Sequence, residues 1–122
     1  MNRPPVIAIY TSRGDAEAFL AYPYLYNRMG EWIGWVTPNR DVYSVLGVYV
    51  GELTKEPRIL RRESVASLKP PKTPPPPPPP LAIPATVPLA PLMSELLPGT
   101  IDVLAEEPHR LHPLDVEGTE IE

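Results

Sequence analysis

The chain has 122 residues, of which 20 are proline and none is cysteine, and its formal net charge is −4 at pH 7. This length allows at most one domain with tails, and the lack of cysteine excludes a disulfide framework and a thiolate zinc site. Residues 1–72 carry ten Lys or Arg against seven Asp or Glu, whereas residues 73–122 carry one against eight. The scattered positive charge of the first part does not predict a nucleic-acid partner, because that function needs a clustered basic face.

Aromatic residues and prolines occupy different parts of the chain. All nine aromatic residues lie between Tyr10 and Tyr49, and 13 of the 20 prolines lie in residues 70–98. A segment that is rich in proline and has no aromatic residue cannot build a core. We therefore predict a folded domain over residues 1–69, a proline-rich linker over residues 70–98 and an acidic, disordered tail over residues 99–122.

A motif recurs at intervals of 16 and 17 residues along the first part of the chain. A tyrosine is followed by a glycine four residues later and by a small residue eight residues later. These positions are Tyr10, Gly14 and Ala18, then Tyr26, Gly30 and Gly34, and then Tyr43, Gly47 and Gly51. A fourth, degenerate copy starts at Ile59, where Ser64 and Leu68 replace the glycines. This self-similarity predicts four tandem units.

Each unit is predicted to form a β-hairpin. A strand leads into a turn at the first glycine, where a positive φ is required, and a second strand returns. One face of the returning strands has no charge in any copy and should be buried; it contains Ala16, Ala18 and Leu20, then Trp32, Gly34 and Val36, and then Tyr49, Gly51 and Leu53. Closing about eight such strands into a shallow barrel would remove their exposed edges. The alternative is an ordinary small barrel of the SH3-like or PRC type, in which the glycines belong to unrelated turns.

The repeat resembles that of the four-fold β-flower proteins, in which four units of the form [ILV]-Y-x3-G-x3-[GA]-x-[VL] precede a tail rich in proline and lysine. The resemblance covers about residues 5–69. It implies an all-β fold, a shallow barrel of pseudo-four-fold symmetry with an apolar centre, and a small bacterial protein without an established activity. Ala18 in the first copy and the loss of both glycines in the fourth depart from the pattern, and they affect the predicted symmetry more than the number of hairpins.

No arrangement of residues predicts an enzyme. The glycines are spaced for strands and not for phosphates. His109 and His112 form an HxxH pair, but prolines flank it in the acidic tail, and we expect a solvated tail there. Arg13, Gly14 and Asp15 form an RGD tripeptide, but the repeat already accounts for its glycine. We therefore expect no catalytic residue, no cofactor and no bound metal.

The predicted domain contains more aromatic side chains than a core of this size needs. An aromatic-lined mouth could bind a small apolar ligand, a lipid headgroup or a partner. The candidates for this ligand or partner surface are Tyr24, Tyr26, Trp32, Trp35 and Tyr49. The alternative is that these residues pack in the core, as aromatic residues of small barrels commonly do.

The proline-rich segment predicts either a stiff spacer or a ligand for a partner. Seven consecutive prolines over residues 74–80 extend roughly 22 Å as polyproline II, at about 3.1 Å per residue. Lys72, Pro75 and Pro78 fit the basic-x-x-P-x-x-P pattern that SH3-type grooves accept. Scattered apolar residues between positions 92 and 104 offer anchors for docking on a partner or on the protein's own barrel.

The function predicted from these features is a non-enzymatic interaction or scaffold module, a β-barrel whose proline-rich tail binds a protein partner or acts as a spacer. The alternative is a barrel that binds a small apolar ligand or a lipid in its apolar centre. No signal peptide is visible, and the uncharged residues 73–94 hold ten prolines, which exclude a spanning helix. We expect a cytoplasmic protein, and the sequence leaves oligomerisation and peripheral membrane contact open.

Overall fold

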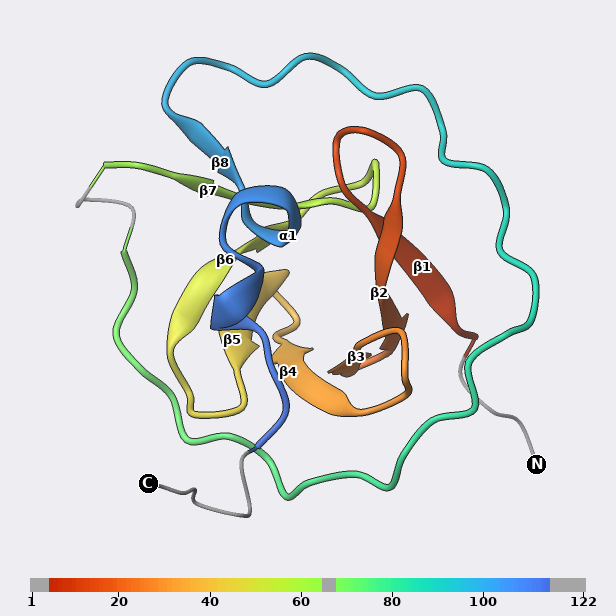
Figure 1. The fold of residues 1–122 in the computed structure, drawn as a ribbon. Coiled ribbons are helices and arrows are strands. Elements are labelled where there is room, and N and C mark those ends of the chain that lie inside the picture. The colour runs from red at the N-terminus through yellow and green to blue at the C-terminus, as the bar shows by residue number, and fades with distance from the viewer. Residues whose placement is uncertain (1–4, 65–67, 115–122) are drawn as a thin grey trace.

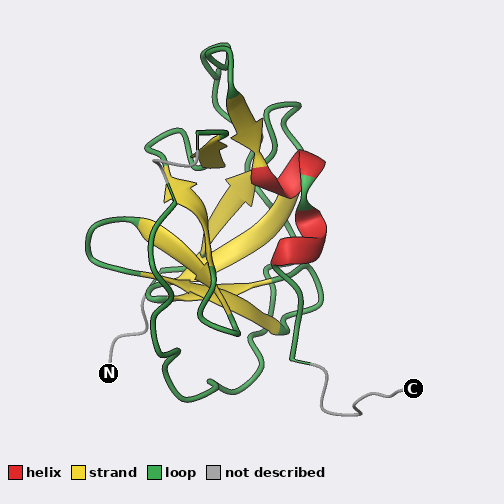
Figure 2. Cartoon of the chain, turned by 90° about the vertical axis from the view of Figure 1, so that its left-hand side faces the viewer, coloured by secondary structure: helices red, strands yellow, loops and turns green. Residues whose placement is uncertain are grey.

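The computed structural model describes residues 5–64 and 68–114. Eight strands form one antiparallel sheet in which neighbours along the chain are also neighbours in space. The elements in chain order are β1 (Ile7–Tyr10), β2 (Ala16–Ala21), β3 (Tyr24–Tyr26), β4 (Trp32–Val36), β5 (Asp41–Ser44), β6 (Tyr49–Leu53), β7 (Ile59–Arg62), β8 (Thr100–Asp102), α1 (Val103–Glu106) and the 3-10 helix η2 (Pro108–Arg110). The sheet is curled into a half-barrel, and α1 and η2 lie together on one side of it (Figures 1 and 2). The prediction of an all-β fold is confirmed.

The first three hairpins share one register. The paired residues are Ile9 with Ala18, Leu25 with Gly34, and Val42 with Gly51, and a register irregularity follows each pair. The glycine of each turn has a positive φ, of 94° at Gly14, 81° at Gly30 and 83° at Gly47. A side chain at these positions would be strained, so the turn glycines have the role that their spacing predicted.

A short polar residue opens each turn of these hairpins. The side-chain oxygens of Thr11, Asn27 and Ser44 accept hydrogen bonds from the backbone N–H groups two and four residues later. Thr37 and Thr54, which open two of the turns between hairpins, accept from the N–H four residues later. Such side-chain turns replace the missing ladder partners of the backbone. Both ends of the curled sheet therefore use the same turn chemistry.

The predicted buried face is wrong at both of its aromatic positions, Trp32 and Tyr49. Leu25 pairs with Gly34, but the next residue of β3, Tyr26, pairs with Trp32, so Ile33 is an extra residue on β4. An extra residue in one strand moves the following side chains to the other face. Ile33 consequently packs in the main core, and Trp32 joins a second cluster on the outer face. The same irregularity on β6 places Val50 in the core in place of Tyr49.

The eighth strand does not come from the degenerate fourth copy of the repeat. Residues 100–102 pair with β7, in the register Leu60 with Asp102 and Arg62 with Thr100. Ser64 lies outside any strand. The prediction of a disordered tail over residues 99–122 is therefore wrong for residues 99–114, whereas residues 115–122 lie outside the described residues.

The reason for this difference is the apolar content of the C-terminal segment. Ile101, Val103, Leu104 and Leu111 are at most 8% exposed and belong to the main core. Burial of four such side chains outweighs the cost of ordering a short segment. The remainder of this core comes from the inward side chains of the strands, namely Ile9, Ala18, Leu20, Leu25, Ile33, Val36, Val42, Val50, Leu53 and Ile59.

The small residue at the centre of each returning strand makes room for close neighbours. A Cβ at Gly34 would lie 2.5 Å from the carbonyl oxygen of Tyr43 and 2.9 Å from Cδ2 of Leu111. A Cβ at Gly51 would lie 2.8 Å from the carbonyl oxygen of Leu60. Close approach of a neighbouring backbone is the usual reason for glycine inside a strand. At Gly34 the space left by the missing side chain is also occupied by Leu111 of the C-terminal segment.

The proline-rich segment passes around the outside of the sheet and connects β7 to β8 (Figure 1). We call residues 70–98 the proline belt. It contains no helix or strand, and it takes the place of the short turn that closes each of the other hairpins. Backbone N–H of Glu63 donates to the carbonyl oxygen of Gly99 at 2.8 Å, where the last hairpin resumes.

Candidate functional site

The proline belt is attached to the hairpin turns at a regular interval. The N–H of Lys72 donates to the carbonyl oxygen of Gly47 at 3.0 Å, and the N–H of Leu81 donates to that of Gly30 at 2.9 Å. Ala90 lies against Gly14, with its Cβ 3.6 Å from the position that a Cβ of Gly14 would occupy. These belt residues are nine positions apart, which is three turns of a polyproline II helix at three residues per turn. They therefore face the same side of the belt.

The burial of the belt follows the same period. Half-buried residues recur every third position in two stretches, first at Pro75, Pro78 and Leu81 and then at Ala90, Met93 and Leu96. Pro84 and Val87, between the two stretches, are exposed, and Pro74 and Ile83 are half-buried outside the series. A polyproline II helix is triangular in cross-section, so one edge can face the sheet while two edges face solvent. The outward edges of the proline run hold Pro76, Pro77, Pro79 and Pro80.

An aromatic surface lies on the outer face of the sheet. Tyr43 is its central residue, with the Trp35 ring stacked on it at 5.1 Å between centroids and the Tyr49 ring edge-on at 5.8 Å. Tyr24 meets Trp32 edge-on at 6.5 Å. Tyr24, Trp35 and Leu81 of the belt also pack against the cluster that contains Tyr26 and Trp32. We define the aromatic surface as Tyr24, Tyr26, Trp32, Trp35, Tyr43 and Tyr49.

The five aromatic residues that the sequence singled out thus lie on one face of the sheet. They lie on the outside of the sheet, and the main core contains none of them. Tyr43 was predicted only as a repeat position, although its alternation with inward Val42 already indicated the outer face. Tyr26 and Trp32 are buried, and Tyr24, Trp35 and Tyr49 are half-buried.

Two tyrosine hydroxyls donate to carbonyl oxygens of the belt. Tyr10 Oη donates to the carbonyl of Pro88 at 2.7 Å, and Tyr43 Oη donates to that of Pro70 at a longer 3.4 Å. Burial raises the pKa of Tyr43 above its ordinary value, so its hydroxyl stays protonated as a donor. Proline carbonyls have no N–H partner within a polyproline II helix and are free to accept. The outer face therefore binds carbonyl oxygens of the belt through two tyrosine hydroxyls.

A carboxylate and two rings hold Lys69, which immediately precedes the belt, and Lys72 within it. Both oxygens of Asp41 accept hydrogen bonds from Nζ of Lys69 at 3.0 Å, and the Asp41 side chain is only 9% exposed. The same Nζ lies 5.9 Å from the centroid of the Tyr49 ring, and Nζ of Lys72 lies 6.0 Å from that of Tyr43. The hydrogen bond with Asp41 raises the pKa of Lys69 above its usual value. Sequence reasoning did not identify Asp41 or Lys69, since 28 residues separate them.

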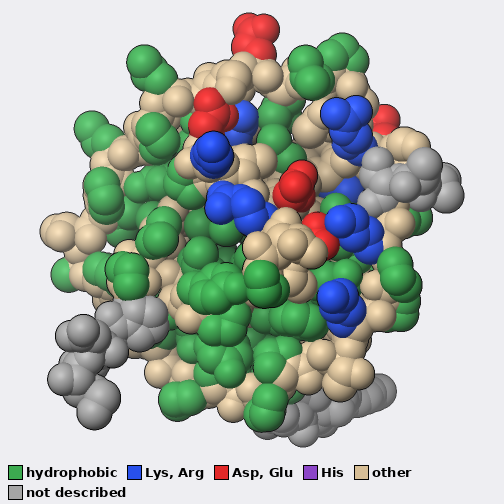
Figure 3. All heavy atoms as spheres, turned by 180° about the vertical axis from the view of Figure 1, so that it is seen from behind, with side chains coloured by type: hydrophobic (Ala, Val, Ile, Leu, Met, Phe, Trp, Pro, Cys, Tyr) green, Lys and Arg blue, Asp and Glu red, His purple; other side chains and the backbone are tan. Residues whose placement is uncertain are grey.

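A groove of about 400 Å³ opens beside Lys69. Asp41 and Tyr49 line it together with Arg62 and Leu97. On the face seen from behind, charged side chains of both signs gather beside a broad area of hydrophobic side chains (Figure 3). Because Tyr49 belongs to both, the groove is continuous with the aromatic surface.

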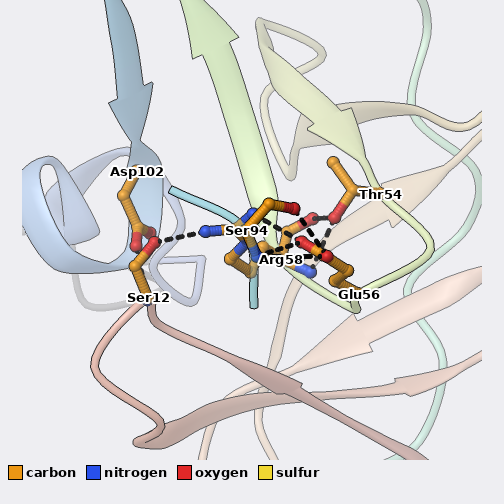
Figure 4. Close-up of polar contacts among 6 residues, drawn as sticks. All are labelled: Ser12, Thr54, Glu56, Arg58, Ser94 and Asp102. Atoms are coloured by element: carbon orange, nitrogen blue, oxygen red, sulfur yellow. Dashed lines mark hydrogen bonds and ion pairs between the residues drawn. The ribbon is translucent and has the colours of Figure 1, made fainter. Parts of the chain in front are cut away.

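A second polar network fastens the edges of the sheet and the end of the belt (Figure 4). The N–H of Ser12, in the turn after β1, donates to Oδ2 of Asp102 on β8 at 2.6 Å. Arg58 donates to Oγ of Ser12 at 2.9 Å and to Glu56 at 2.6 Å. The Ser94 hydroxyl of the belt donates to Glu56 at 2.7 Å. Since β1 and β8 are the edge strands, we assign this network to holding the half-barrel together.

The C-terminal segment is held by an ion pair that predicts acid sensitivity. Arg61 donates to both oxygens of Glu107, at 2.7 and 3.1 Å, and Arg110 adds a third contact at 2.6 Å. The hydrogen bonds with Arg61 and the one with Arg110 lower the pKa of Glu107 from 4.5 to about 2. A carboxyl group whose pKa is lowered by folding stabilises the fold at pH values above its pKa in the unfolded chain. For Glu107 this stabilisation is lost as the pH falls from 4.5 to about 2.

We therefore expect Glu107→Gln to lower the free energy of unfolding at pH 7 by about 2 kcal/mol, after allowance for solvent screening. Below pH 2 the variant and the wild type should converge. Urea denaturation at pH 7, 4 and 2 measures this, with Glu17→Gln as a control because Glu17 makes no ion pair among the described residues. An equal loss for Glu107→Gln at every pH would contradict the assignment.

The residues set aside by the sequence reasoning lie outside the aromatic surface. Arg13, Gly14 and Asp15 form the turn between β1 and β2. His109 is an exposed residue of η2, and His112 is exposed beyond it. Within residues 5–64 and 68–114, no group of three His, Cys, Asp or Glu side chains is arranged to hold a metal ion. In the same residues no helix has the length and apolar character needed to cross a membrane.

The chain was compared with known proteins. Neither the models of known protein families, nor the curated proteins, nor the solved structures gave a match to this chain.

Proposed function

We propose that the protein is a non-enzymatic interaction module that presents its proline belt to a protein partner. The observation that carries this proposal is the exposure of Pro76, Pro77, Pro79 and Pro80, between anchors at Lys72 and Leu81. These four prolines form two exposed pairs that are separated by the half-buried Pro78. Aromatic-lined grooves of the SH3, WW and EVH1 type bind such pairs on a polyproline II ligand.

The anchors favour this function because they fix the ligand before it binds. A free proline-rich peptide loses conformational freedom on binding, and a ligand already held in its bound shape avoids part of that cost. A partner that reads the outward edges would not need to remove the belt from the sheet. The pattern predicted from the sequence, with Lys72, Pro75 and Pro78, is less suitable, because Pro75 and Pro78 are half-buried.

The small-ligand alternative takes second place. It requires space at the apolar centre, and side chains of the C-terminal segment, Val103, Leu104 and Leu111, are packed in the main core. The resemblance to the β-flower proteins supports a repeated origin of the hairpins and adds no activity. The four-fold arrangement and a cytoplasmic location accordingly remain part of the proposal, and neither bears on the choice between the two functions.

The proposal is tested with purified SH3, WW and EVH1 domains titrated against the full-length protein by calorimetry. We expect at least one class to bind, and substitution of Pro76, Pro77, Pro79 and Pro80 by alanine to weaken that binding about tenfold or more, which is about 1.4 kcal/mol. The matched control replaces the inward Pro75 and Pro78 by alanine and should retain binding. If no domain class binds, or if the outward variant binds like the wild type, the proposal fails.

A further inference from the structure

We infer that the aromatic surface is itself a receptor for a basic, proline-rich segment of another protein, which competes with the chain's own belt. This goes beyond the proposed function, in which the belt is the ligand and the partner supplies the groove. The belt indicates the chemistry of the occupant, because its Lys72 lies over Tyr43 and its Leu81 packs against the cluster that contains Tyr26 and Trp32. The sheet and the belt together form a receptor with its ligand bound in the same chain.

The first element of recognition is the set of rings on β4 and β5, the strands that lie between the two anchors of the proline run. Lys72 is anchored at the turn after β5, and Leu81 is anchored at the turn between β3 and β4. The seven prolines between these anchors must therefore pass the outer side of β5 and β4, which carry Trp35, Tyr43 and Trp32. Rings that flank a polyproline II helix are the common feature of proline-binding domains.

The second element is a hydroxyl that reads the backbone. Tyr43 Oη donates to the carbonyl of Pro70, just before the proline run. Tyr10 Oη repeats this contact at Pro88, 18 residues further along the belt. Two tyrosine hydroxyls that both donate to a proline carbonyl indicate that the outer face binds the backbone of the belt and not one particular side chain.

The third element is charge selectivity at one end. The largely buried Asp41 accepts two hydrogen bonds from Lys69, and the Tyr49 ring lies against the same ammonium group. Lys72 lies over Tyr43 one polyproline turn later. A ligand that enters from another protein would need a lysine or arginine immediately before its prolines in order to satisfy Asp41.

The fourth element is a donor that the belt leaves unused. Nε1 of Trp35 is buried and has no hydrogen-bond acceptor among the described residues. A buried donor without an acceptor is costly. By contrast, Nε1 of Trp32 donates to the carbonyl of Gly34 at 2.7 Å. An incoming ligand whose carbonyl reaches Trp35 would gain a contact that the belt does not make, which gives it a means to compete.

The belt has the advantage of being part of the same chain. A tethered segment acts at a high effective concentration, so a free ligand must exceed it in affinity or concentration. Weakening the belt should therefore strengthen binding of the free ligand. This dependence separates a receptor surface from a surface that is merely covered.

The test uses an acetylated and amidated peptide with the sequence of residues 68–82, and a full-length variant in which residues 74–80 are replaced by a Gly-Ser segment of equal length. We expect this loosened variant to bind the peptide about tenfold or more tightly than the wild type does, measured by tryptophan fluorescence and calorimetry. Asp41→Asn in the loosened variant should weaken binding, and so should replacement of the peptide's first lysine by alanine. Asp15→Asn, at an exposed turn, is the matched control and should have no effect.

A second measurement keeps the proposal testable if the loosened variant does not fold. The wild type has two tryptophans, so its NMR spectrum contains two indole N–H signals, which Trp35→Phe assigns. Excess peptide should shift the signal of Trp35 more than that of Trp32, whose Nε1 already donates to Gly34. No binding by a folded loosened variant, or no shift of Trp35 at saturating peptide, overturns the proposal.

Two further outcomes are decisive. Binding that does not depend on Asp41 or on the peptide's lysine would overturn the assignment of a basic ligand. A complex between the loosened variant and the wild-type chain that forms without peptide would identify the belt of a second copy as the occupant, and would overturn the assignment to another protein. Neither result depends on whether SH3, WW or EVH1 domains bind the belt, so this proposal and the proposed function fail separately.

Discussion

A chain that ends at Pro98 is expected to lose cooperative folding. The truncation removes β8 and the buried side chains of Ile101, Val103, Leu104 and Leu111. Burial of an aliphatic side chain contributes roughly 1.5–3 kcal/mol, so the four together contribute about 6–12 kcal/mol. A domain of this size has a total stability of about 5–15 kcal/mol. Far-ultraviolet circular dichroism during urea denaturation measures the loss.

The matched control is a chain that ends at Leu114. It keeps every core residue that the structure describes, so its unfolding midpoint should equal that of the full chain. Cutting at Lys69 should be as damaging as cutting at Pro98, although the sequence predicted residues 1–69 as an independent domain. A cooperative transition of the 1–98 chain with the full-length midpoint would show that β8 is dispensable.

Replacing a turn glycine by alanine is expected to destabilise the fold more where the belt rests on the turn, at Gly30 and Gly47, than at Gly14. Gly14, Gly30 and Gly47 all have a positive φ, so alanine should cost roughly 1–2 kcal/mol at each. At Gly30 the new Cβ would also collide with the carbonyl oxygen of Leu81, and at Gly47 with that of Lys72. Displacing the backbone of the belt at these two positions should add roughly 1–3 kcal/mol to the loss of stability.

The comparison with Gly14→Ala isolates the belt, because a Cβ there would only make an ordinary contact with Ala90 at 3.6 Å. Urea denaturation gives the difference in stability between the variants. Amide hydrogen exchange gives its location, since the N–H of Leu81 should exchange faster in Gly30→Ala and at the wild-type rate in Gly14→Ala. Equal losses at Gly14 and Gly30 would mean that the belt does not rest on the turn at Gly30.

The hairpins were predictable because their information is local. The turn at Gly30 is specified by a glycine that must adopt positive φ and by Asn27, which accepts from N–H groups two and four residues later. The faces of the strands were less predictable. A single extra residue, Ile33, exchanged the positions expected for Trp32 and its neighbours, and periodicity alone does not reveal a bulge.

The last strand and the candidate site were not predictable in the same way. The apolar residues around Ile101 were recognised as anchors, but nothing local identifies β7 as their partner. The pairing of Asp41 with Lys69 likewise depends on where the belt passes. The nine-residue spacing of Lys72, Leu81 and Ala90 is visible in the sequence, but it has meaning only once the distance between hairpin turns is known.

The place of the belt between β7 and β8 has a consequence for the order of folding. The first three hairpins close turns of a few residues, whereas the fourth must bring Glu63 and Gly99 together across residues 64–98. Loop-closure entropy makes this step about 2 kcal/mol less favourable than closing a short turn. The first six strands should therefore assemble early, and β8 should join last. During synthesis the half-barrel cannot be completed until Leu111 has left the ribosome, so its maturation waits until long after the first six strands have been made.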